Sequence, residues 1–167
     1  MTSTRRLRSY DYVNQPMASV LTALKRGAPG IFTRATNGAA EREHAIGVQL
    51  RVKIGPLDVA TDVHVEVGSV EGPSPSPAGH EVAAFPLTWS SASSPSLFPH
   101  MQAKLLVYPL SSSETQLEFE GTYDPPFGLL GDAIDSVAGH RVAEACVLHF
   151  VQDVAAQLRT ELGTSRA

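Results

Sequence analysis

The chain has 167 residues, a formal net charge of −4 and a single cysteine, Cys146. Nucleic-acid-binding domains usually carry a basic patch, so this acidic composition argues against a nucleic-acid partner. One cysteine allows no intrachain disulfide, which favours a reducing compartment. No apolar run reaches the roughly 20 residues of a membrane-spanning helix. We therefore expect one cytoplasmic domain over residues 1–167 with no transmembrane segment.

The N-terminal region predicts a strand followed by a short helix. Residues 5–13 suit a first strand, and a stripe of apolar residues in 16–26 has the spacing of one helix face. Gly27 and Pro29 end that helix. A further short helical turn is expected over residues 30–35.

Residues 44–67 predict a β-hairpin. Apolar residues occupy every even position from Ile46 to Ile54, and the odd positions, apart from Thr61, from Leu57 to Val67. This alternation is typical of strands with one buried face, and its parity changes at Gly55-Pro56. The register predicted from this change pairs Val48 with Val63 and Lys53 with Asp58.

Three more strands are predicted over residues 81–90, 100–110 and 115–123. A loop with an odd number of residues, at 111–113, would place the apolar faces of the strands 100–110 and 115–123 on the same side of the sheet. Between strands, residues 72–79 contain three prolines and predict a loop, and residues 90–99 form a second loop with an apolar Leu97-Phe98 tip. The expected inward positions include three small residues, Ala83, Ala103 and Gly121, which would leave room between the layers.

Residues 132–162 predict a long C-terminal helix without an internal proline. The helix carries an apolar stripe at helical spacing, formed by Ile134, Val137, Leu148, Val151, Ala155, Leu158 and Leu162.

The segment Gly121-Thr-Tyr-Asp-Pro-Pro-Phe-Gly-Leu-Leu-Gly-Asp132, with His140 to Glu144 and Phe150 after it, resembles the end of bacterial polyketide-cyclase-like proteins. The order of predicted elements resembles the whole helix-grip superfamily, which includes START-type lipid-transfer domains and pollen-allergen-like proteins. The resemblance implies an α+β fold in which a curved antiparallel sheet of six or seven strands wraps around the C-terminal helix, with one or two short helices after the first strand. It also implies a deep apolar cavity between sheet and helix.

We predict that an apolar small molecule, such as a lipid, an isoprenoid or a polyketide-like compound, occupies this cavity. Its polar contacts are expected from Thr61, Trp89, Tyr123 and Arg141, and the Leu97-Phe98 loop would cover its mouth. The full set of expected lining residues is Leu50, Thr61, Val63, Phe85, Leu87, Trp89, Leu105, Phe119, Tyr123, Arg141 and Leu148.

Other patterns favour structural roles. Asp62, His64 and Glu66 share one strand face and have metal-ligand chemistry, but a solvated face is the simpler interpretation. His140, Arg141 and Glu144 form either a surface ion pair on the helix or a polar anchor at the base of the cavity. Cys146 is best explained as a small apolar residue.

No nucleophile elbow, phosphate loop, dinucleotide fingerprint or zinc-helix motif is present. We therefore expect no metal, no cofactor and no catalytic residue, and we favour a binding protein over an enzyme. Two alternatives stay open: a cyclase/dehydratase-like enzyme that uses the same cavity, and a regulatory or interaction protein whose cavity is filled. A homodimer is also compatible with the sequence.

Overall fold

The computed structural model describes residues 4–28, 30–32, 34, 63–91, 100–123 and 134–164, with the backbone alone at 63, 64, 91, 134–142 and 164. Residues 17–28 are helical, as are 30–32 and 34. The strands and the long helix follow in the order β1 (Arg5–Val13), β2 (Val63–Val67), β3 (Glu71–Pro75), β4 (Glu81–Ser91), β5 (Met101–Pro109), β6 (Thr115–Tyr123) and α2 (Ile134–Thr164).

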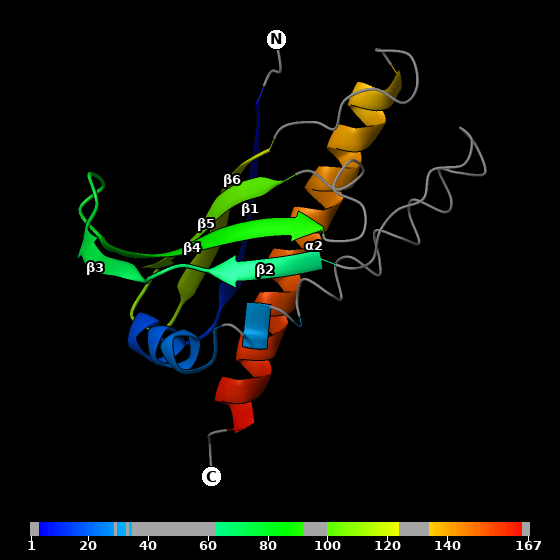
Figure 1. Cartoon of the computed structure of the whole chain (residues 1–167). Coiled ribbons are helices and arrows are strands. Elements are labelled where there is room, and N and C mark those ends of the chain that lie inside the picture. The colour runs from blue at the N-terminus through cyan, green and yellow to red at the C-terminus, as the bar shows by residue number, and fades with distance from the viewer. Residues whose placement is uncertain are drawn as a thin grey trace.

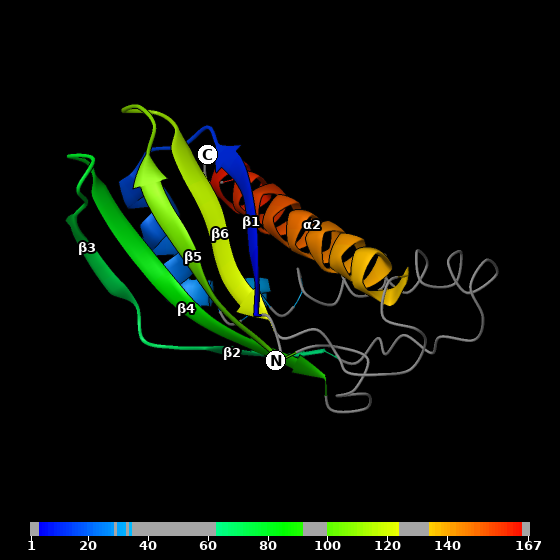
Figure 2. The same ribbon diagram turned by 90° about the horizontal axis from the view of Figure 1, so that it is seen from above.

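The six strands form one antiparallel sheet in the order β1-β6-β5-β4-β2, and β3 also pairs with β4. Strand β5 pairs with β6 so that Leu105 lies opposite Phe119, which confirms the predicted alignment of their apolar faces. In Figure 2 the sheet is seen beside the long helix α2, with β1 and β6 nearest to it. This arrangement is the helix-grip fold, as the resemblance implied.

Strands β2 and β3 share one edge of β4 (Figure 1). Val67 pairs with Leu87 and Glu71 pairs with Ala84. Between these pairs the chain bends at Gly68, whose N–H donates to the carbonyl of Pro86 at 2.8 Å. One edge of the sheet is thus built from two short consecutive strands.

Strand β3 corrects the prediction of a loop over residues 72–79. Residues up to Pro75 pair with β4, and the loop is reduced to a tight turn in which Gly79 N–H donates to the carbonyl of Ser76 at 3.0 Å. Proline is tolerated in a strand when that strand lies at a sheet edge, which is where β3 lies. The proline content therefore indicated the edge and not the absence of a strand.

Part of the predicted hairpin lies outside the described residues, including positions 44–62 and the two register pairs that involve them. Its last five residues form β2, and Val65 of β2 pairs with Trp89 of β4. The loop tip Leu97-Phe98 also lies outside the described residues.

The core between the layers is organised around Phe150 of α2. Its ring centroid lies 5.9 Å from that of Phe32, 5.6 Å from that of Trp89 and 5.8 Å from that of Phe119. Phe32 in turn packs edge-on against Phe85 at 6.1 Å. Aromatic pairs at such distances stabilise beyond the area they bury, so this cluster joins α2, β4, β6 and the early helical segment.

The buried face of α2 differs from the predicted stripe. Val151, Ala155 and Leu158 are buried as expected, but Leu148 is 41% exposed. Successive helical residues turn by about 100°, so Leu148 points away once its neighbour Val147 faces the sheet. The buried face consists of Ala143, Cys146, Val147, Phe150, Val151, Val154, Ala155 and Leu158.

Replacing Phe150 by alanine should lower the free energy of unfolding by about 3–5 kcal/mol, the usual cost for a buried phenylalanine. Leu148→Ala is the matched control, because Leu148 is on the same helix and 41% exposed. It should change stability by about 0.5 kcal/mol or less, as surface substitutions do. Urea denaturation followed by circular dichroism measures both. Equal losses in the two variants would contradict this orientation of α2.

Candidate functional site

The inner face of the sheet carries the predicted apolar wall. Strand pairing places residues of four strands in cross-strand rows, one of which contains Trp89, Met101, Tyr123 and Arg5. Six of the predicted lining residues are buried on this face, and the structure brings them together: Phe85, Leu87, Trp89, Leu105, Phe119 and Tyr123.

The remaining predicted positions do not join this wall in the described structure. Leu50 and Thr61 lie outside the described residues, and Val63 and Arg141 are described by their backbone alone. The prediction that Leu148 lines the site is wrong, since this residue lies on the exposed side of α2.

Three residues of the wall were missing from the predicted site. Met101 is buried and pairs with both Trp89 and Tyr123. Phe150 reaches the wall from α2. Arg5 lies opposite Tyr123. It is separated from the buried Leu7 and Val13 by an even number of residues along the strand, and this spacing was the sequence signal that it faces inward.

Tyr123 supplies a polar group to the apolar wall. Its side chain is 3% exposed, and burial raises the pKa of its phenol. Arg5 opposes this shift by its charge and a hydrogen bond, while the Glu144 carboxylate adds to it. The net pKa is raised, so the phenol stays neutral at physiological pH. Tyr123 therefore offers a hydrogen-bonding hydroxyl and not a charge.

The space above Gly121 is filled. A Cβ at this position would come within 2.8 Å of the Phe119 ring and 3.1 Å of Ala103 Cβ. The expectation that Gly121 leaves room for a ligand is therefore wrong, because the Phe119 ring lies over it. Glycine is needed here to admit that ring.

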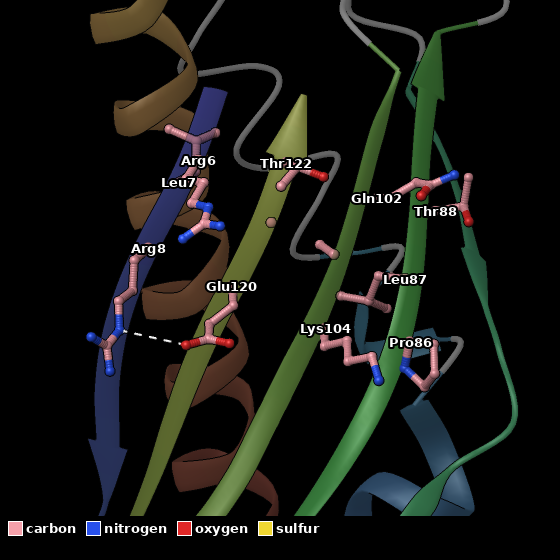
Figure 3. A pocket seen from close by; sticks show the side chains of 12 residues that line it. Arg6, Leu7, Arg8, Pro86, Leu87, Thr88, Gln102, Lys104, Glu120 and Thr122 are labelled. Atoms are coloured by element: carbon pink, nitrogen blue, oxygen red, sulfur yellow. Dashed lines mark ion pairs between the residues drawn. The ribbon is translucent and has the colours of Figure 1, made fainter. Parts of the chain in front are cut away.

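The outer face of the sheet carries an open trough with a volume of about 690 Å³. Figure 3 looks onto this face, with α2 behind the strands. Two cross-strand rows of side chains form its walls, and a third row, Leu7, Gly121, Ala103 and Leu87, lies between them. The first row is Arg6, Thr122, Gln102 and Thr88, and the second is Arg8, Glu120, Lys104 and Pro86.

Beside the second row, a buried carboxylate links three strands. Glu118 of β6 is 3% exposed and forms an ion pair with Nε of Arg8 in β1. Tyr108 of β5 donates its hydroxyl hydrogen to Glu118 at 2.5 Å, and Gln116 Nε2 donates to the Tyr108 oxygen at 2.6 Å. This network ties the outer surfaces of β1, β5 and β6 together.

The network shifts two pKa values in opposite directions. Burial raises the pKa of Glu118, but the hydrogen bonds from Arg8 and Tyr108 together with the charge of Arg8 outweigh it, so the net pKa is lowered. Burial, with the hydrogen bond to Glu118, raises the pKa of Tyr108 to about 12. Glu118 is therefore an anion and Tyr108 a neutral donor throughout the physiological range.

Within the described ranges, no group of three His, Cys, Asp or Glu residues is placed to hold a metal ion. Three residues with metal-ligand chemistry were noted on one strand face in the sequence. Of these, Asp62 lies outside the described ranges, the side chain of His64 is not described, and Glu66 is exposed. No helix in the described part of the chain is both long and apolar enough to cross a membrane.

No protein-family model matches the sequence, and no curated protein matches it. Among solved structures, the chain is similar to the Zhui aromatase/cyclase from Streptomyces sp. R1128, at 11% identity over 96% of both chains with a TM-score of 0.49. It is also similar to norcoclaurine synthase from Thalictrum flavum, at 10% identity over 99% of this chain and 90% of that one, with a TM-score of 0.45. Likenesses at these identities concern the fold alone and assign neither a ligand nor a reaction.

Replacing Glu118 by glutamine should destabilise the protein by about 1–3 kcal/mol at pH 7, because hydrogen bonds to a charged group are lost. The folded pKa of Glu118 lies below its ordinary value of 4.5. The stabilisation by its carboxylate is therefore complete above pH 4.5 and is lost as the pH falls through the folded pKa. Urea denaturation should show the wild type and E118Q converging below pH 4.5. Glu120→Gln is the control and should have little effect on stability, because the Glu120 side chain is 53% exposed. If E118Q stayed less stable than the wild type by the same free energy down to pH 3, this account would be contradicted.

Proposed function

We propose that the protein binds an apolar small molecule between the inner face of the sheet and α2. The observation that carries this proposal is the composition of the inner wall, where buried Leu87, Trp89 and Met101 adjoin a single buried phenol, Tyr123. Ligand pockets are typically apolar, with a few polar groups that fix the orientation of the ligand. A lipid, an isoprenoid or a polyketide-like compound has the matching chemistry.

The aromatic cluster limits where such a ligand lies. Phe150 and Phe119 occupy the middle of the interior, and Arg159 near the C-terminal end of α2 pairs with Asp11 of β1 at 3.0 Å. The Tyr123 end of the sheet lies away from that pair and within electrostatic range of Glu144. We place the ligand at this end, against Trp89, Met101 and Tyr123.

A neutral Tyr123 suits ligand binding better than proton transfer. A phenol with a raised pKa does not ionise at physiological pH, so it acts as a hydrogen-bond donor to a carbonyl, hydroxyl or carboxylate of the ligand. The cyclase/dehydratase hypothesis would need a further acid or base. A cytoplasmic location and a homodimer stay predictions.

The packed aromatic cluster supports a second candidate function. Ring centroids 5.6–6.1 Å apart join Phe32, Phe85, Trp89, Phe119 and Phe150 into one filled region. If such packing extends to the Tyr123 end, the interior admits no ligand and the protein is a regulatory or interaction module.

Trp89 is the single tryptophan and reports on the proposed site. Titration with oleate, with cholesterol and with the dye 1-anilinonaphthalene-8-sulfonate should change its fluorescence saturably. Tyr123→Phe should weaken oleate binding by about tenfold or more, the effect of one hydrogen bond to a charged carboxylate. Tyr10→Phe is the matched control, because Tyr10 is 67% exposed and on the opposite face.

Saturable binding that responds to Y123F and not to Y10F supports the proposed ligand site. Absence of a saturable signal with all three probes would refute it and favour the filled-interior alternative.

A further inference from the structure

The walls of the trough on the outer face are rows of mostly polar side chains, each of which crosses four neighbouring strands. Its first row places one guanidinium, two hydroxyl groups and one amide across four neighbouring strands, at Arg6, Thr122, Gln102 and Thr88. Strands lie about 4.8 Å apart, so the row spans about 14 Å. The volume of about 690 Å³ falls within the usual range of small-molecule sites, about 300–1,000 Å³.

The ion pairs of the trough leave one of its cations, at the β1 end, without a carboxylate partner among the described residues. Lys104 of the second row pairs with Glu71 at 2.8 Å, and Arg8 pairs with Glu118 and, at 3.8 Å, with Glu120. No ion pair to Arg6 occurs within the described ranges of the chain, although the whole chain is acidic, with a net charge of −4. Arg6 is therefore the cation of the trough whose charge is left for a ligand.

Arg8 contributes hydrogen-bond donors at this end, while the carboxylates of Glu118 and Glu120 offset its charge. Both of its ion pairs run through Nε, so its Nη groups remain as further donors beside Arg6. The buried carboxylate of Glu118 holds the Arg8 side chain in place, which lowers the conformational entropy that a ligand would have to remove. Figure 3 shows Arg6 and Arg8 on β1 at one end and Pro86 and Thr88 on β4 at the other.

We propose that this trough is a binding site for a small hydroxylated anion, of the sugar-acid or sugar-phosphate class. Its anionic group binds between Arg6 and Arg8, because guanidinium groups match carboxylate and phosphate oxygens. Its hydroxyl groups extend along Thr122 and Gln102, whose side chains both donate and accept hydrogen bonds. The site is separate from the inner apolar wall, since neighbouring residues of a strand face opposite sides of the sheet.

Nuclear magnetic resonance of the full ¹⁵N-labelled chain tests this proposal. Glucuronate and glucose 6-phosphate are titrated at low salt, with neutral glucose as the reference ligand. We expect saturable shifts of the Arg6, Gln102 and Thr122 amides with the two anions, at least tenfold weaker binding of glucose, and no change in Trp89 fluorescence. The anion that binds more tightly identifies a carboxylate or a phosphate as the preferred group.

Two substitutions locate the binding groups. Arg6→Gln should weaken binding of the tighter anion at least tenfold, the effect of losing a charged hydrogen-bond donor. Arg26→Gln is the matched control, because Arg26 is exposed on the early helix and outside the trough. Gln102→Ala should weaken the binding of that sugar anion but not that of inorganic phosphate, which is too short to contact both Arg6 and Gln102.

Two results would overturn the proposal. One is the absence of saturable shifts with both anions up to about 10 mM, tenfold above a 1 mM dissociation constant. The other is equal binding by R6Q and R26Q. Arg6 is exposed, so loss of folding does not confuse the comparison.

Discussion

The fold depends on the contact of one helical side chain with rings from three other segments. Phe150 meets Phe32, Trp89 and Phe119 at 5.6–5.9 Å, and in doing so it sets which face of α2 lies against the sheet. An antiparallel sheet with one apolar face is stable only when that face is covered. The aromatic cluster provides this cover where four elements meet, and the positions of the remaining core residues follow from it.

The two faces of the sheet are consequences of the same alternation. Because Trp89 and Tyr123 face inward, their strand neighbours Thr88 and Thr122 face outward, and the trough occurs on the side that the helices leave open. An apolar site and a polar site are thus built from adjacent residues of the same strands. A substitution that shifts the register of β6 would disturb both.

Much of the sheet could be predicted from the sequence, because alternation in β4, β5 and β6 is regular. The orientation of α2 could not be predicted in this way. Ala143 and Cys146 are small residues that occur on either side of a helix, and including Leu148 in the apolar stripe assigned the buried face to the wrong side. The buried state of Glu118 was also beyond sequence analysis: alternation assigns it to the wet face, and its burial depends on Arg8 and Tyr108 from two other strands. Contacts between side chains of separate strands leave no periodic signal.

The edge formed by β3 limits how this protein can associate. Two of its five residues, Pro73 and Pro75, carry no N–H group, so an approaching strand finds too few donors to continue the sheet. The edge therefore resists the strand-to-strand growth that leads to aggregates and amyloid-like fibrils. Self-association through this edge would have to use side-chain surfaces and not the hydrogen-bonding groups of β3.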